Sequence, residues 1–439
     1  MFKNLPIGLS VLVFVVGACR SYDLNVIGRM PLGEIVAFAT IPFFILKRRA
    51  FSPSEKKRLF VVCGAVGLWL LGVIISDVLV QNVFLSFLRG ALKPLFCVLW
   101  MLFFVGIVRK DYRLIAVLPF GFVVASIQNF LFPQGWTAQH LQSGGYGKIV
   151  YGYTPMIVAV VLACATLVYF RSRVLSVLSG VLFIGLGVIV ALLGGSRSAA
   201  GVAALVGLVI FCAIYIQRKD SRNIRRMFSK SKLILMAALL VLMSVSIYYV
   251  YVYGASEGMF GEAQRKKIED QGNTIFGRSP IGLLLDGRAP VYGAILAILD
   301  NPYSGYGSWS GVGMADYYYD AVVTVGTDAR EIEEISESFR GGSVGHSIYF
   351  GVWLENGLIA MIGMLVLMSS ITKVFVDTVR FPNILVPILS YLYIGFLWSF
   401  LFSPFGTSHR MVVGLFFALY ILGFPRLNIQ NRSMGIMRV

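Results

Sequence analysis

Repeated apolar runs constrain the fold of this chain more than any other feature of its sequence. Many of them are roughly 17 to 22 residues long, which is the length that an α-helix needs to cross a hydrocarbon core of about 30 Å. Only 13% of the 439 residues are charged, whereas soluble domains carry about a quarter. A transmembrane β-barrel would instead show alternating segments of ~10 residues. The sequence therefore predicts an all-α polytopic membrane protein.

Twelve membrane-spanning helices account for these runs. The first run is as short as the hydrophobic region of a signal peptide, but the many later spans favour a retained helix. A long polar segment, residues 254–345, separates helices 1 to 9 (residues 1–253) from helices 10 to 12 and a tail (residues 346–439). The predicted spans cover about residues 6–18, 33–46, 59–76, 91–108, 114–131, 153–170, 174–193, 199–216, 233–253, 346–371, 384–402 and 409–424.

The distribution of charge predicts the orientation of the chain. Its net charge is +17, and Lys and Arg gather in alternate loops, as they do on the cytoplasmic side of membrane proteins. This distribution explains the positive charge without a nucleic-acid partner. We expect both termini in the cytoplasm and the long polar segment on the opposite face, which in a bacterial inner membrane is the periplasm.

The cysteines and the acidic residues predict no metal site. All five cysteines fall in apolar segments, without the spacing of a zinc site or a disulfide framework. The carboxylates of residues 315–340 have no ordered ligand pattern, so we interpret them as a solvated acidic flap over the membrane surface.

Charged residues inside a membrane are costly and usually functional. The cores of most predicted spans contain none, and a proton-coupled transporter would place such groups near the midplane. Glu355 is the main candidate for that role, about 13 Å below His346 on one helix. The other notable polar groups cluster at the outer ends of helices: Arg89, Lys93, Arg197, Arg288 and His346.

The arginines at the outer surface could hold an anion. Arg197 is the sole charge in a hairpin of small residues, where it either caps the carbonyls of the preceding helix or reaches into a cavity. Arg288 lies near the N-terminus of an amphipathic helix predicted within residues 279–300, where a bound phosphate would relieve its conflict with the helix dipole. Two or three arginines suit a pyrophosphate. For Arg89 and Lys93, a pyrophosphate role and anchoring of the fourth helix remain equally open.

His346 marks the junction between the long loop and the tenth predicted span. On physical grounds it is either a catalytic group or an interfacial histidine that hydrogen-bonds the backbone. The other two histidines have less support, because His140 lies in a Gly-rich loop and His409 follows a short loop at the outer end of the last span. Arg410, beside His409, would add to the same positive surface.

Three short motifs occupy the second half of the chain. They are Gly195-Ser-Arg-Ser198, then Gly287-Arg288 followed by Asn301-Pro-Tyr-Ser-Gly-Tyr-Gly307, and finally His346-Ser347 with nine residues before Gly357. Together they resemble the O-antigen ligase and polymerase superfamily, and the last is similar to the motif of the ligases. Two positions depart from that pattern: Tyr292 stands where related sequences often have Trp, and Ala360 replaces the usual Gly, Thr or Tyr.

The resemblance implies a glycosyltransferase of the C-type membrane architecture. Its donor would be a glycan on undecaprenyl pyrophosphate, its acceptor a sugar hydroxyl of the lipid A-core oligosaccharide, and its other partners membrane lipids. The transfer would invert the anomeric configuration and use neither metal nor cofactor. His346 would be the general base, and Arg197 and Arg288 would bind the pyrophosphate, with Arg89 and Lys93 as further candidates. The alternatives are a polymerase with a lipid-linked glycan as acceptor, and a polysaccharide or small-molecule transporter.

Overall fold

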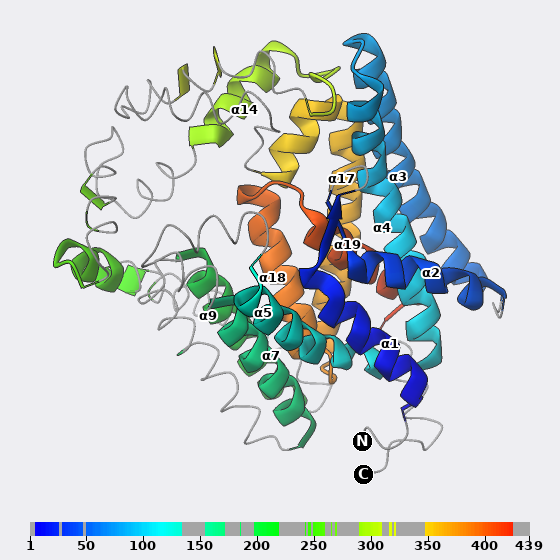
Figure 1. Cartoon of the computed structure of the whole chain (residues 1–439), viewed down its shortest axis with the longest axis vertical. Helices are drawn as coiled ribbons and strands as arrows, with labels where there is room; N and C mark the ends of the chain where they lie inside the picture. The colour runs from blue at the N-terminus through cyan, green and yellow to red at the C-terminus, as the bar shows by residue number, and fades with distance from the viewer. Residues whose placement is uncertain are drawn as a thin grey trace.

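The computed structural model of the chain is mostly helical and contains little sheet (Figure 1). The structure describes eight ranges of residues and, between them, a few isolated helical positions. These residues are 5–25, 29–46, 50–133, 154–171, 197–218, 249–259, 289–309 and 347–424, and the isolated positions are 185, 242, 245–246, 265, 268–269, 316–317 and 320–321.

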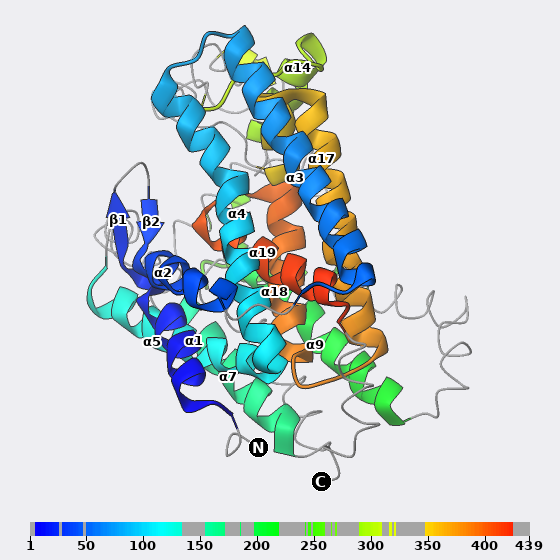
Figure 2. The ribbon, with the colours of Figure 1, turned by 90° about the vertical axis from the view of Figure 1, so that its right-hand side faces the viewer.

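Within the described ranges, three helical stretches are long and apolar enough to cross a membrane, judged by length and composition: Pro53–Leu79, Phe84–Leu131 and Ile348–Arg380. Helix α3 is the first, α4 (Phe84–Asp111) is the main part of the second, and α17 is the third. The three helices lie side by side in both views (Figures 1 and 2). They define a helical, membrane-embedded protein.

Small residues let α3 and α17 approach closely. A Cβ on Gly72 of α3 would lie 2.6 Å from the Cβ of Ala360, and one on Gly363 of α17 would lie 2.6 Å from the carbonyl oxygen of Ala65. Such small-residue contacts are typical of helix pairs in membranes, where association depends on close packing.

Shorter helices surround the three long ones. Helix α1 (Ile7–Ala18) packs on α5 (Leu118–Leu131), α19 (Thr407–Leu422) packs on α4, and α18 (Val386–Phe402) packs on α9 (Arg197–Arg218). Helix α2 (Leu32–Leu46) lies across α4 (Figure 2). The remaining elements are α7 (Thr154–Arg171), α14 (Ala289–Asp300), the short helices η2 (Cys19–Ser21) and η3 (Tyr112–Val117), and the antiparallel strands β1 (Asp23–Asn25) and β2 (Arg29–Pro31).

Most predicted spans coincide with a helix, but several boundaries were wrong. Helix α3 begins at Pro53, six residues before the predicted start, because Ser52 and Glu55 form a capping box. Helix α17 does not stop before Lys373 but continues to Arg380. The charge of Lys373 does not end the helix because its side chain is exposed, while the neighbouring Val374 is buried. The strands β1 and β2 were not predicted. The seventh and ninth spans lie largely outside the described residues, so the count of twelve stays a prediction.

Candidate functional site

The turn formed by residues 301–309, called the 301–309 turn below, joins helix α14 to helix α17. The backbone N–H groups of Tyr306 and Gly307 donate to the carbonyls of Leu354 and Glu355, each over 2.9 Å. In return, the N–H of Leu358 donates to the carbonyl of Tyr303 over 3.1 Å. Two motif segments that lie far apart in the sequence are therefore joined backbone to backbone.

A kink in α17 makes this junction possible. Gly357 has φ +73° and ψ −174° inside the helix, so the carbonyls before it are free to accept from the turn. A Cβ on Gly357 would collide with the carbonyl oxygen of Tyr303. Gly305 also has a positive φ, +72°, and a Cβ there would lie 2.7 Å from the nitrogen of Gly357. Both positions need glycine because of conformation and space together.

Side chains also fix the turn to its neighbours. The indole Nε1 of Trp353 donates to the carbonyl of Pro302 over 2.8 Å, and the hydroxyl of Tyr306 donates to the carbonyl of Ala297 over 3.0 Å. The hydroxyl of Tyr317 donates to a carboxylate oxygen of Asp300 over 2.6 Å, and this hydrogen bond raises the pKa of Tyr317. The turn is thus held from α14 as well as from α17.

Two buried polar residues of α3 complete the attachment. The Ser76 hydroxyl donates to the carbonyl of Glu355 over 2.6 Å and accepts from the N–H of Gly307 over 2.9 Å. Asp77 accepts from both the N–H and the hydroxyl of Ser308, over 2.6 and 2.8 Å. Because Asp77 is only 4% exposed, the loss of its partners would leave a buried carboxylate without hydrogen bonds. The 301–309 turn, α3 and α17 therefore form one rigid unit.

A buried ion pair adds helix α4 to this unit. The Lys93 Nζ lies 2.6 Å from Glu355 Oε2, and the two side chains are 11% and 6% exposed. The Trp309 ring lies beside Lys93 and Arg89, with its centroid 5.3 Å from Lys93 Nζ and 5.9 Å from the Arg89 guanidinium carbon. Lys93 and the residue considered for proton coupling, Glu355, thus occupy the same site.

The other predicted site residues are placed only in part. Arg288, His346 and His140 lie outside the described residues, and of Arg197 the structure describes only that α9 begins there. Ser347, the residue after His346, caps α17: its hydroxyl accepts from the N–H of Phe350 over 3.2 Å and donates to the carbonyl of Phe400 over 2.8 Å. The start of α17 is therefore fixed to the last turn of α18.

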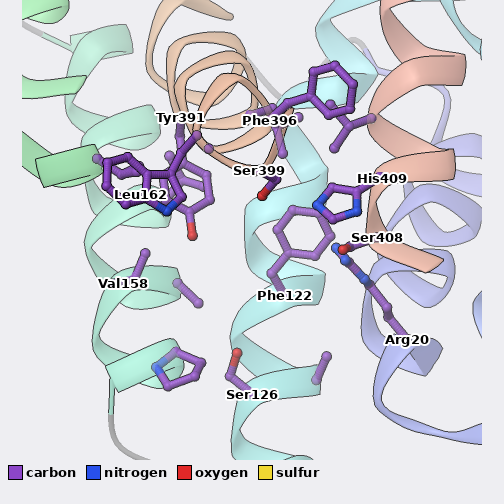
Figure 3. Close-up of a pocket in the computed structure, with 18 of the residues that line it drawn as sticks. Arg20, Phe122, Ser126, Val158, Leu162, Tyr391, Phe396, Ser399, Ser408 and His409 are labelled. Carbon is purple, nitrogen blue, oxygen red and sulfur yellow. The ribbon is translucent and has the colours of Figure 1, made fainter. Parts of the chain in front are cut away.

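A cavity of about 630 Å³ lies between α5, α7, α9, α18 and α19 (Figure 3). Ser399 and Ser403, on either side of Phe400 near the end of α18, line it. So do Val202 and Ala203, in the second turn of α9 after Arg197. Helix α9, which begins at Arg197, therefore lines the cavity directly. Helix α17 contacts α18, which lines the cavity, through the bond from Ser347 to Phe400.

Two cavity residues were missed or undervalued by sequence reasoning. Arg20, in η2, and His409, in the first turn of α19, stand on the same wall (Figure 3). A lone arginine between two short apolar runs gives no motif, and His409 had no charged neighbour along the chain except Arg410. Only the packing of α1 and α19 brings the two side chains to one place.

Arg410 does not extend a positive surface, and that prediction was wrong. Its side chain is 16% exposed, and its Nη1 lies 3.2 Å from Oε2 of Glu34. The other carboxylate oxygen of Glu34 accepts from Trp100 Nε1 over 3.0 Å. Arg410 turns inward because Glu34, only 1% exposed, requires a counter-charge.

Comparisons with protein-family models and with curated proteins found no match to this chain. The structure itself defines a helical membrane protein with two polar features: the unit formed by the 301–309 turn, α3, α4 and α17, and the cavity between α5, α7, α9, α18 and α19.

Proposed function

We propose that this protein transfers a glycan from undecaprenyl pyrophosphate to a sugar hydroxyl of the lipid A-core oligosaccharide. The proposal includes a twelve-helix, C-type glycosyltransferase architecture in a bacterial inner membrane, with both termini in the cytoplasm and the reaction at the periplasmic face.

One observation carries the proposal: two segments that resemble the ligase motifs are joined in space, and the start of the second is fixed to α18, a helix that lines a cavity. The 301–309 turn binds α17 at Gly357, and Ser347 of the same motif binds Phe400. Phe400 lies between two serines that line the cavity. The glycine kink and the capped helix start fix α17 from Ser347 onward, and a catalytic base requires a fixed support of this kind.

The proposed reaction is a single displacement. His346 removes the proton of the acceptor hydroxyl, whose oxygen forms a bond to the anomeric carbon as the bond from that carbon to the pyrophosphate oxygen breaks. A general base of this kind contributes about 10²–10⁴-fold to the rate. The electron pair leaves on the pyrophosphate, whose charge Arg197 and Arg288 stabilise.

The geometry supports different roles for the remaining candidates. The ammonium group of Lys93 is already neutralised by Glu355 at 2.6 Å, so we assign Lys93 to anchoring α4 rather than to pyrophosphate binding. The pairing also gives a transporter less support, since a proton-coupling carboxylate must exchange protons during its cycle. Arg89 shares the Trp309 ring with Lys93, and we assign it to the same anchor.

Purified protein in liposomes tests the proposal. Undecaprenyl-pyrophosphate-linked glycan is added with lipid A-core oligosaccharide or, in a separate reaction, without it, and no energy source is supplied. We expect glycan on the lipid A-core. Growth of the lipid-linked glycan alone would instead establish a polymerase, and absence of any transfer with both acceptors would overturn the proposal. The His346→Ala variant serves as the inactive control.

A further inference from the structure

Arg20 is a cation at the wall of the cavity. Its guanidinium lies 5.5 Å from the centre of the Phe122 ring, but no group in the described part of the chain accepts a hydrogen bond from it. The side chain is half-buried and lines the cavity. A guanidinium carries five N–H donors, and a site of low polarity makes unsatisfied donors costly. The arrangement leaves these donors available for a ligand.

His409 offers a second donor beside Arg20. Its Nδ1 accepts from the backbone N–H of Gly406 over 2.8 Å, so the proton of the neutral ring is on Nε2. The ring is held between Phe396 and Phe405, with centroids 6.0 and 5.8 Å away. Nε2–H therefore has a fixed position on the wall that also carries Arg20 (Figure 3).

Counted over the residues that the structure describes, the charges around Arg20 leave an excess of one positive charge. Three arginines interact in this region, Arg20, Arg29 and Arg410, against two carboxylates, Asp23 and Glu34. Glu34 is hydrogen-bonded to Arg410 and Trp100, so it does not satisfy Arg20. The N-terminus of α19, which begins at Thr407, adds a partial positive charge at the same wall.

The rest of the cavity is largely apolar. Its volume, about 630 Å³, lies within the range of small-molecule sites, about 300–1,000 Å³. Tyr391 lies across the cavity from Arg20 and His409 (Figure 3). The apolar residues on its walls come from five helices and include Phe122, Val158, Leu162, Val202, Phe396 and Val412. A ligand that fits these features has a compact anionic group and a hydrocarbon chain.

We propose that this cavity binds the phosphate group of a polyprenyl-linked ligand, with Arg20 and His409 as phosphate ligands and the apolar walls around the first isoprene units. The inference rests on the proposed function in naming the lipid-linked donor as the occupant. The inference adds Arg20 and His409, which belong to none of the sequence motifs, to the residues that bind the lipid-linked donor. Arg20 binds two phosphate oxygens with its fork of N–H groups, and His409 binds a third from Nε2.

Binding is measured with full-length protein in nanodiscs of neutral lipid, without an acceptor. The three probes are undecaprenyl phosphate, undecaprenol and inorganic pyrophosphate. We expect undecaprenyl phosphate to bind most tightly, Arg20→Gln to weaken it at least tenfold, and Arg20→Lys to recover part of the loss. His409→Asn keeps an acceptor for Gly406 but removes the Nε2 donor, so it should weaken binding several-fold.

Two further variants separate the sources of the effect. Val158→Phe fills the apolar part of the cavity and should reduce the affinity for undecaprenyl phosphate but not for inorganic pyrophosphate. Arg380→Gln removes an exposed charge from the end of α17 and should change neither. Unchanged binding in Arg20→Gln, or equal binding of undecaprenol and its phosphate, would overturn the inference. The lipid assignment would be overturned if inorganic pyrophosphate bound as tightly as undecaprenyl phosphate and Val158→Phe changed neither affinity.

The assay also separates this inference from the proposed function. Arg20-dependent lipid binding without any glycan transfer would overturn the function and support the site. Transfer that continues in Arg20→Gln with unchanged lipid binding would overturn the site alone.

Discussion

Lys93 and Glu355 lie 262 positions apart in the sequence, yet their Nζ and Oε2 atoms are 2.6 Å apart in the protein. The pair connects α4 to α17 at the level where the 301–309 turn binds α17. Glu355 Oε1 is buried and has no hydrogen-bond partner among the described residues, so Lys93 is the main compensation for this charge. A pair of this kind adds little net stability but makes either partner costly to remove alone.

We therefore expect Lys93→Met to lower the free energy of unfolding by about 3–5 kcal/mol, because it leaves the Glu355 carboxylate buried and unpaired. The double variant Lys93→Met, Glu355→Leu should recover most of this loss. Thermal unfolding in detergent, followed for both single variants and the double variant, gives the coupling energy. A Lys93→Met protein as stable as the wild type would contradict the ion pair.

Gly357→Ala should be destabilised by at least about 1–3 kcal/mol, the usual cost of a residue forced into an unfavourable backbone region. The new methyl group would also strike the Tyr303 carbonyl and separate the 301–309 turn from α17. Gly67→Ala is the matched control, because a Cβ at this exposed position of α3 meets nothing within 4 Å. It should be neutral or slightly stabilising. Equal unfolding temperatures for the two variants would argue against the kink.

Ser347→Ala should lower stability by about 0.5–2 kcal/mol, the usual cost of losing a helix cap. It should reduce glycan transfer by more than this stability loss explains, because the bond to Phe400 that fixes the start of α17 is lost with it. Ser347→Thr keeps the hydroxyl and should retain most activity. Ser369→Ala, at an exposed position of the same helix, is the control for a serine without such contacts. Transfer rates are compared at equal amounts of folded protein.

His346→Ala should insert and fold normally but make little or no ligated product, because the acceptor hydroxyl then has no base. The lipopolysaccharide of cells that carry the variant shows the result on a gel. Wild-type product levels would remove His346 from the mechanism.

Arg197→Lys and Arg288→Lys should each lose much of the transfer activity although the positive charge is kept. A lysine cannot donate hydrogen bonds to two phosphate oxygens in the forked geometry of arginine. Initial rates at saturating donor, measured on purified variants, test this. Full activity in both would instead indicate a point charge or a structural role.

The positions of the helices could largely be predicted from the sequence, because length and hydropathy are local properties. The boundaries were less accurate. The predicted third span began at the apolar residues after Arg58, whereas α3 begins at the capping box of Ser52, which includes the charged residues in its first turns. The free-energy cost of a charged residue in a helix depends on which face of the helix it occupies. Lys373 was predicted to lie beyond the end of a span, but it lies on an exposed face of α17, which continues past it.

The polar site was predictable only in its components. The sequence drew notice to Lys93, Glu355, Gly357 and the 301–309 segment separately. It could not show that they are in contact, because pairing across hundreds of residues depends on how the helices pack. Arg20 and His409 had still less signal, since neither belongs to a motif and their shared wall exists only after α1 and α19 are in place.

The sequence by itself determined that this protein is helical and embedded in a membrane, because long apolar runs with few charges have no other stable environment. It also placed the motif glycines and the start of α17. Only the tertiary structure decided which charges are paired and which face a cavity. Lys93 and Arg410 are neutralised by carboxylates from distant helices, whereas Arg20 has no such partner among the described residues. The energy of a charge in a membrane protein depends on its neighbours in space, and the order of residues along the chain does not specify them.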